Sequence, residues 1–323
     1  MIRWIAGRAT EAALTAALAF VVLVILLHLL PGDPLTAVLR DHPADPAVVA
    51  ALRHRWGTDR TIWQSLIAFG GGLLHGDLGV SVSEQRDVLT VIGERLPATL
   101  LLAGLTLLVD FTIGLALGVW SALHPESIRA RLVGALTVIG YALPAFVIGL
   151  VLVWIFAVKL GWFPPSGVSD PLLSPSAGIM AVLADRARHI ALPLAALVIA
   201  TLAVPLRQQR TSALATAGQP WVAAARARGV RPALVAWRHC WRPALTPIVT
   251  LLGLWLPMLV AGSVFVESVF AWPGVGLLLA QATAERDIPL VMATGLVLIC
   301  VIQLGSLLAD FLYRVVDPAQ RPA

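Results

Sequence analysis

The stretch AALTAALAFVVLVILLHLL, residues 12–30, decides the class of this chain. It carries no formal charge, and at about 1.5 Å per residue in a helix it approaches the roughly 30 Å of a bilayer core. Arg3 and Arg8 precede it, and LLPGDP follows it instead of a small-residue cleavage site. We therefore expect an uncleaved first transmembrane helix rather than a signal peptide.

The composition of the whole chain points the same way. Of 323 residues, 59% are hydrophobic and 13% are charged, and the mean hydropathy is +0.87. A soluble domain has about a quarter of its residues charged. The net charge of +5 would suggest a nucleic-acid partner in a soluble protein. In so apolar a chain we interpret the basic residues as topology signals and expect no nucleic acid partner.

The fold class that these patterns predict is all-α, a polytopic membrane protein with six transmembrane helices. The fourth predicted helix is short and is framed by Pro193 and Pro205. The six apolar windows are residues 9–30, 98–122, 132–158, 189–206, 246–266 and 289–313. We divide the chain into 1–30 (N-terminus and first helix), 31–97 (an outer helical segment), 98–313 (a five-helix core with a cytoplasmic loop at 207–245) and 314–323 (a tail).

The arginines predict the orientation of the chain. Segment 207–245 holds seven arginines and no acidic residue, whereas acids outnumber bases in 31–97. Basic residues collect on the cytoplasmic side of membrane proteins. We therefore expect a multi-pass membrane protein with both termini in the cytoplasm.

The cytoplasmic loop carries local folding signals. Pro220 suits the first turn of a helix over 220–228, and Gly229 suits the left-handed position after it. Pro232 can open a second helix. One interpretation is a loop that only fixes topology. The other is a docking helix, which small alanines beside the large ring of Trp221 favour.

The loop resembles the EAA loop of the permeases of ABC importers, through Ala223, Ala224 and Ala225, then three residues, and then Gly229. WVAAARARGVRPALVAWRHCWRPALTPIVT (221–250) is similar to the form found in dipeptide, oligopeptide and nickel permeases. Other stretches that carry the resemblance are LLPGDP (29–34), HGDLG (75–79), ERLPATLLLA (94–103), LGWFPPSG (160–167), HIALPLAAL (189–197), VESVFAWPGVG (266–276), RDIPLV (286–291) and LADFLYRVVDP (308–318). The resemblance implies the ABC importer type I permease fold.

The resemblance also implies that the first loop helix couples the permease to an ATPase. The coupling residues that it implies are Trp221, Ala223, Ala224, Ala225, Arg226, Arg228 and Gly229. Two positions depart from the pattern: Ala223 replaces the motif glutamate, and Pro220 replaces an acidic residue often found there. Docking would then depend on Trp221, the alanines and the arginines.

The chain lacks the residues of a phosphate-binding loop. Its one lysine, Lys159, is followed by Leu160, whereas that loop needs Gly-Lys-Ser/Thr. We therefore expect no catalysis and no bound cofactor in this chain, with ATP and Mg²⁺ on partner subunits. The resemblance implies a second, homologous permease, two cytoplasmic ATPase subunits and an extracellular solute-binding protein. The seven histidines are scattered and predict no metal site, and Cys240 and Cys300 predict no disulfide.

Asp110 lies midway along the second predicted span, where a charge is costly. It is a candidate either for the transport pathway or for a polar contact between helices. On the outer side we expect helices within 45–57 and 61–74, and Trp272 suits the membrane interface. Candidates for an outer gate or for docking of the binding protein are Asp33, Asp77, Trp272, Pro273 and Gly274.

The sequence thus predicts a permease subunit of an ATP-driven importer, forming half of a pathway for dipeptides or oligopeptides. Nickel, metal chelates and glutathione are alternative substrates, because similar permeases carry them. A secondary transporter acting alone is the rival from another class. One acid in mid-span and an alanine-rich loop argue against it, since ion-coupled transporters use several intramembrane charges.

Overall fold

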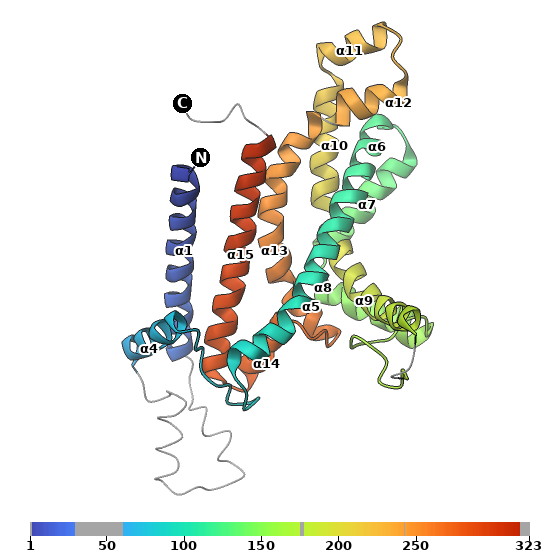
Figure 1. Cartoon of the computed structure of the whole chain (residues 1–323). Coiled ribbons are helices and arrows are strands. Elements are labelled where there is room, and N and C mark those ends of the chain that lie inside the picture. The colour runs from blue at the N-terminus through green and yellow to red at the C-terminus, as the bar shows by residue number, and fades with distance from the viewer. Residues whose placement is uncertain (1, 30–60, 175–177, 242, 317–323) are drawn as a thin grey trace, which may run out of the picture. The chain divides into compact units, whose positions relative to one another are not determined.

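The computed structural model describes residues 2–29, 61–174, 178–241 and 243–316, and Figure 1 shows their arrangement. These residues are almost entirely helical. The β-structure within the described ranges is an isolated bridge between Val80 and Asp87. The chain forms two compact units: residues 1–99 with 273–304, and residues 100–272 with 305–323.

The first unit is held together by contacts between its N-terminal and C-terminal helices. The Gln303 side chain on α15 donates a hydrogen bond to the Ala12 carbonyl on α1 (3.1 Å), and the rings of Phe20 and Phe69 lie 4.9 Å apart. A core cluster includes Val88, Val91 and Leu290. The helices that lie in this unit wholly or in part are α1 (Ile2–Leu29), α4 (Ile62–Leu74), α5 (Val88–Val109), α14 (Val275–Ala284) and α15 (Ile288–Val316).

The second unit contains most of the helices of the predicted core. α6 packs along α10, and α8 packs against α9. The elements are the end of α5, η1 (Asp110–Gly114), α6 (Leu115–Leu123), α7 (Ile128–Ala142), α8 (Ala145–Leu152), η2 (Val153–Lys159), α9 (Ile179–Thr201), α10 (Ala203–Ala217), α11 (Pro220–Ala227), α12 (Pro232–Leu234), η3 (Val235–Trp241), η4 (Pro243–Leu245) and α13 (Thr246–Val269).

The predicted all-α membrane fold is confirmed, but the count of six straight spans is not. Three helical stretches in the described residues are long and apolar enough to cross a membrane, and up to five if each of two bent pairs is one span. The three are Gly7–Leu29, Val88–Leu123 and Ile288–Leu308. α13, with 24 residues, covers the predicted window 246–266. The linear division of the chain into domains stays a prediction.

The predicted window 132–158 is a broken helix rather than a continuous one. α7 and the α8–η2 helix meet at an angle of 106° around Leu143 and Pro144. Both residues have extended backbones, with ψ of 138° and 137°. Proline lacks an N–H and disfavours the helical conformation of the residue before it, so the helix ends there.

The predicted window 189–206 is part of a longer bent helix. α9 begins at Ile179, inside the stretch predicted as a loop, and α10 continues to Ala217 after a bend of 44°. The bend lies close to Pro205, and a proline bends a helix because it has no backbone N–H to donate to the preceding turn. The loop predicted to be cytoplasmic therefore begins as a direct continuation of a membrane helix.

The outer segment contains one of the two predicted helices within the described residues. α4 begins after Thr61, whose side chain accepts a hydrogen bond from the Gln64 backbone, while the Gln64 side chain accepts one from Thr61. This capping box pairs two backbone donors that the helix itself leaves unpaired. The helix predicted within 45–57, and Asp33, lie outside the described residues.

Candidate functional site

The loop helix α11 has the ends that the sequence predicts. Pro220 occupies its first turn, and Gly229 follows it with φ of +75°. The Gly229 N–H donates to the Arg226 carbonyl (2.9 Å), and the Val230 N–H donates to the Ala225 carbonyl (3.2 Å). These two bonds form the Schellman motif, which needs a left-handed residue at the glycine position. The chain therefore reverses sharply after α11.

α11 has one buried and one exposed face. Val222 and Ala225 are fully buried in a cluster with Val235 and Cys240 of η3. Trp221 is 51% exposed, although it is a large apolar ring. The exposed side chains of the predicted coupling residues are Trp221, Ala223, Ala224, Arg226 and Arg228, together with Gly229. The predicted docking face is thus open, with Ala225 as the one predicted member that packs inward.

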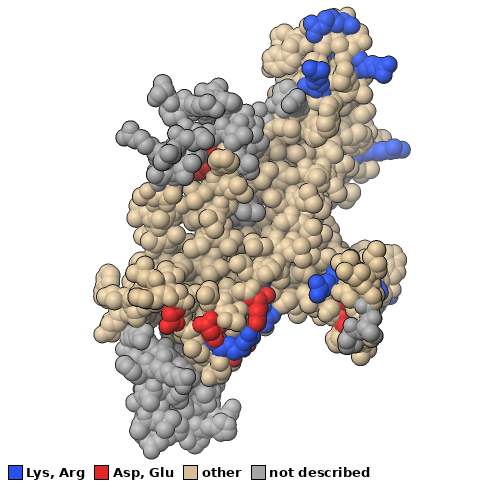
Figure 2. Space-filling view, viewed as in Figure 1, with Lys and Arg blue, Asp and Glu red and all other residues tan. Residues whose placement is uncertain are grey.

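The tip, which we define as Pro220–Trp241, carries a strong positive charge. Arg226, Arg228, Arg231 and Arg238 are exposed on it. In Figure 2 the end of the second unit formed by α11 and α12 shows basic side chains and no acidic ones on the face in view. Burial raises the pKa of the Cys240 thiol beneath this surface. The tip therefore presents to a partner a short helix with one large aromatic ring, surrounded by positively charged side chains.

The tip is attached to the membrane helices through close packing. A Cβ placed on Gly118 of α6 would lie 2.6 Å from the Leu206 carbonyl oxygen of α10, so only glycine allows this approach. Ala122, Ala213 and Ala244 join α6, α10 and η4 in one small-residue cluster. Small residues let helices pack at short distance in membranes. Within the tip, α11 packs on η3, and η3 in turn packs against α10 and α6. A displacement of α11 would therefore be transmitted to α10 and α6.

Asp110 is a contact between helices in the structure. It is fully buried at the start of the π-helical turn η1. Its Oδ2 accepts hydrogen bonds from the Thr201 hydroxyl (2.7 Å) and from the Trp255 indole N–H (3.2 Å). It thereby links α5, α9 and α13. Of the two sequence interpretations, the geometry agrees with the interhelix contact.

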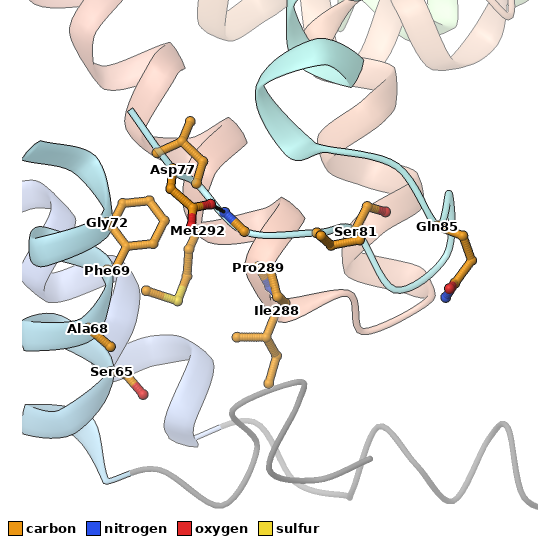
Figure 3. A pocket seen from close by; sticks show the side chains of 13 residues that line it. Ser65, Ala68, Phe69, Gly72, Asp77, Ser81, Gln85, Ile288, Pro289 and Met292 are labelled. Carbon is orange, nitrogen blue, oxygen red and sulfur yellow. Dashed lines mark hydrogen bonds between the residues drawn. The ribbon is translucent and has the colours of Figure 1, made fainter. Parts of the chain in front are cut away.

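The end of the first unit that carries the segment predicted to be outside contains a pocket of about 430 Å³ (Figure 3). Ser65 and Phe69 of α4 line it on one side, and Ser81 and Gln85 line it on the other. Asp77 also lines it; its Oδ1 accepts a hydrogen bond from the Gly79 N–H (2.8 Å), and its side chain is exposed. Asp77 is therefore positioned where an external partner could reach it.

Asp287 holds the loop before α5 against the start of α15, and it is not among the residues that the sequence predicts to be functional. It is fully buried, and its Oδ2 accepts bonds from the Ser81 hydroxyl (2.6 Å) and from the Ser83 backbone and hydroxyl (both 2.9 Å). Its Oδ1 accepts the Leu290 N–H at the start of α15 (3.1 Å). The signal was present in the sequence as Asp287-Ile-Pro before an apolar run, which is a helix start.

The loop after α13 is more buried than the sequence predicts. Trp272 is 4% exposed, so its ring packs inside the protein, and its place at the membrane interface stays a prediction. Gly274 is buried and Pro273 is half-buried, and the roles of all three in gating or docking stay predictions. Glu267, which the sequence analysis did not select, is fully buried and accepts a bond from the Ser263 hydroxyl (3.1 Å).

Comparison with known proteins defines the class first and then the family. The fold resembles that of a chain in the methionine ABC transporter MetNI, solved in inward-facing conformations, with a TM-score of 0.56 and 19% identity over 71% of this chain and 97% of that chain. Residues 114–322 match the family described as binding-protein-dependent transport system inner membrane component. The chain belongs to this family, and it is a multi-pass permease of an ABC transporter system that has other subunits.

Relatives extend over nearly the whole chain. The di/tripeptide transport system permease of Pseudomonas aeruginosa is 35% identical over 308 residues, 92% of each chain. The oligopeptide transport system permease of Bacillus subtilis is 33% identical over 299 residues, 91% of each. The glutathione transport system permease of Pectobacterium atrosepticum is 35% identical over 307 residues, 95% of each. The family resemblance seen in the sequence is thus confirmed.

Proposed function

We propose that this permease forms half of a pathway that imports peptides across a bacterial inner membrane, with both termini in the cytoplasm. The relatives named for dipeptide, tripeptide and oligopeptide transport support this substrate. Glutathione, itself a small peptide, is the first alternative, because one relative carries it. Nickel and metal chelates are weaker alternatives on these grounds.

The observation that carries the proposal is the exposed face of α11. A half-exposed tryptophan beside small alanines on a short helix suits insertion into a groove on another protein. We assign that groove to a cytoplasmic ATPase subunit that binds ATP and Mg²⁺. Two such subunits, one under each permease of a heterodimer, would bring the two coupling helices together when ATP binds.

The outer pocket supports a second contact in the same system. Its Asp77, serine and backbone groups offer acceptors and donors to a protein that arrives from outside. We assign this end of the chain to the docking of the solute-binding protein. Substrate selection would then occur largely on that protein.

The proposal is tested by uptake in membrane vesicles that contain both permeases, the ATPases and the binding protein. We expect import of a labelled dipeptide or tripeptide to require ATP and the binding protein, and to continue when a protonophore collapses the proton gradient. Vesicles in which the ATPase carries an inactivated phosphate-binding loop are the control. Uptake that persists without ATP and stops with the protonophore would show a secondary transporter instead.

A further inference from the structure

A second cavity, open to the surface, is lined by α7 and α10 of the other unit. Its volume is about 330 Å³, and four polar side chains line it together with Val138, Ala203 and Val204. The polar ones are Tyr141 of α7 and Arg207, Gln208 and Thr211 of α10. It lies just beyond the 44° bend between α9 and α10. A guanidinium, a phenol, an amide and a hydroxyl are a concentrated polar set for so apolar a chain.

The polar groups of this cavity are open to a ligand. Arg207 is exposed, and no hydrogen bond or ion pair ties it to another residue in the parts of the chain that the structure describes. Tyr141 is 51% exposed. The other arginines of α7 and α10, which are Arg129, Arg131 and Arg210, do not line the cavity. Arg207 is therefore the cationic group available there.

The depth of the cavity indicates what fills it. Tyr141 lies ten residues after Arg131 on α7, which corresponds to about 15 Å along the helix. The headgroup layer on each side of a bilayer is only about 5–8 Å thick. Arg207 is the first residue of the predicted cytoplasmic segment, but α10 continues for ten residues beyond it to Ala217, which is about 15 Å of helix. Its guanidinium therefore lies on the helix well before the tip, and a guanidinium at the depth of the acyl chains faces a water-filled cavity far more often than lipid. The cavity thus suits a transport pathway better than a site for a lipid phosphate.

We propose that Arg207 lines the transport pathway and pairs with the carboxylate of the peptide as it passes, with Tyr141, Gln208 and Thr211 hydrogen-bonding the same end of the substrate. This inference rests on the proposed function and adds a specificity residue to it. Arginine suits the task because its planar fork matches a carboxylate with two parallel hydrogen bonds. The adjacent bend would change the width of this part of the pathway when α10 moves.

The test compares a dipeptide with its C-terminal amide as substrates for ATP-driven uptake. We expect Arg207→Gln to reduce uptake of the free acid about ten-fold, the scale of a lost charge-assisted bond, and to leave uptake of the amide within about two-fold of wild type. Arg207→Lys should retain part of the wild-type uptake of the free acid, because lysine keeps the positive charge but not the planar fork. Arg210→Gln, an equally charged neighbour outside the cavity, is the matched control.

The outcomes separate this inference from the function on which it rests. If wild type imports neither substrate with ATP, the proposed function itself is wrong. If wild type imports the dipeptide and Arg207→Gln changes nothing, the assignment of Arg207 is overturned. An equal loss for both substrates also overturns it, and dependence of that loss on anionic lipid in the vesicles would identify a lipid-phosphate site.

If the binding protein does not deliver the amide, a second measurement tests whether Arg207 faces a water-filled pathway. Val204→Cys, made in a chain with Cys240→Ala and Cys300→Ala and assembled in nanodiscs, places a thiol in the cavity. We expect a water-soluble anionic methanethiosulfonate to react several-fold faster than a cationic one, and Arg207→Gln to remove this preference. Failure of both reagents to react would show that the cavity is filled by lipid, which contradicts the proposal.

Discussion

Replacement of Trp221 by alanine is the sharpest test of the coupling surface. Trp221 is 51% exposed, and a tryptophan side chain buries up to about 250 Å². Docking would therefore cover roughly a further 110 Å² of ring. At about 25 cal/mol per Å², the loss amounts to about 2–3 kcal/mol, or roughly 30- to 150-fold in affinity for the ATPase. Folding of the chain should change little, because the buried face of α11 is formed by Val222 and Ala225.

The assay is co-purification of the ATPase with the permease in mild detergent, followed by titration of purified ATPase onto the permease pair in nanodiscs. Trp63→Ala is the matched control, since Trp63 is 73% exposed but lies on α4, in the segment assigned to the outer side. We expect normal membrane insertion of both variants and loss of ATPase only from Trp221→Ala. Equal retention of the ATPase by wild type and Trp221→Ala would refute the reasoning, because the ring would then contribute no docking energy.

Three further predictions concern the parts that support the two candidate surfaces. Asp287→Ala removes the acceptor of four hydrogen bonds and should lower the free energy of unfolding by about 2–4 kcal/mol. This loss should appear as a lower melting temperature in detergent, whereas Asp77→Ala, which removes the acceptor of the Gly79 bond, should lower it far less. Gly118→Leu should force α6 from α10 and reduce the amount of protein in the membrane, while Gly104→Ala, whose added Cβ meets no atom within 4 Å, should not. Because burial raises the pKa of the Cys240 thiol, a smaller fraction of this thiol is ionised at pH 8 than in free cysteine. Iodoacetamide should therefore modify Cys240 more slowly than free cysteine until the protein is denatured, and an equal rate in the folded protein would contradict the prediction.

The sequence predicts the local features of this protein well. Pro220, Gly229 and Pro232 act through their own backbone preferences, so the positions of α11 and of the turn after it follow from residue type alone. Apolar length likewise predicts the membrane helices before and after the loop. Composition and motif order also identify the family, because each motif adds independent information.

Geometry that depends on distant partners is not predictable in this way. Pro144 is visible in the sequence, but whether a proline kinks a helix slightly or breaks it by 106° depends on what packs against both halves. The burial of Trp272 and the hydrogen bonds of Asp287 to residues some 200 positions earlier are equally non-local. Asp110 was recognised as costly, but only the structure shows its donors on two other helices.

The break at Leu143–Pro144 has a consequence for how the chain is made. Its two halves, α7 with 15 residues and the α8–η2 helix over residues 145–159, each fall short of the roughly 20 apolar residues that a stable span requires. Neither half is therefore a good independent insertion signal as the nascent chain leaves the ribosome. The pair must enter the bilayer as one bent span, or wait in the insertion machinery until later helices shield its ends. Biogenesis of this permease should thus be most sensitive to delay while residues 128–159 are emerging.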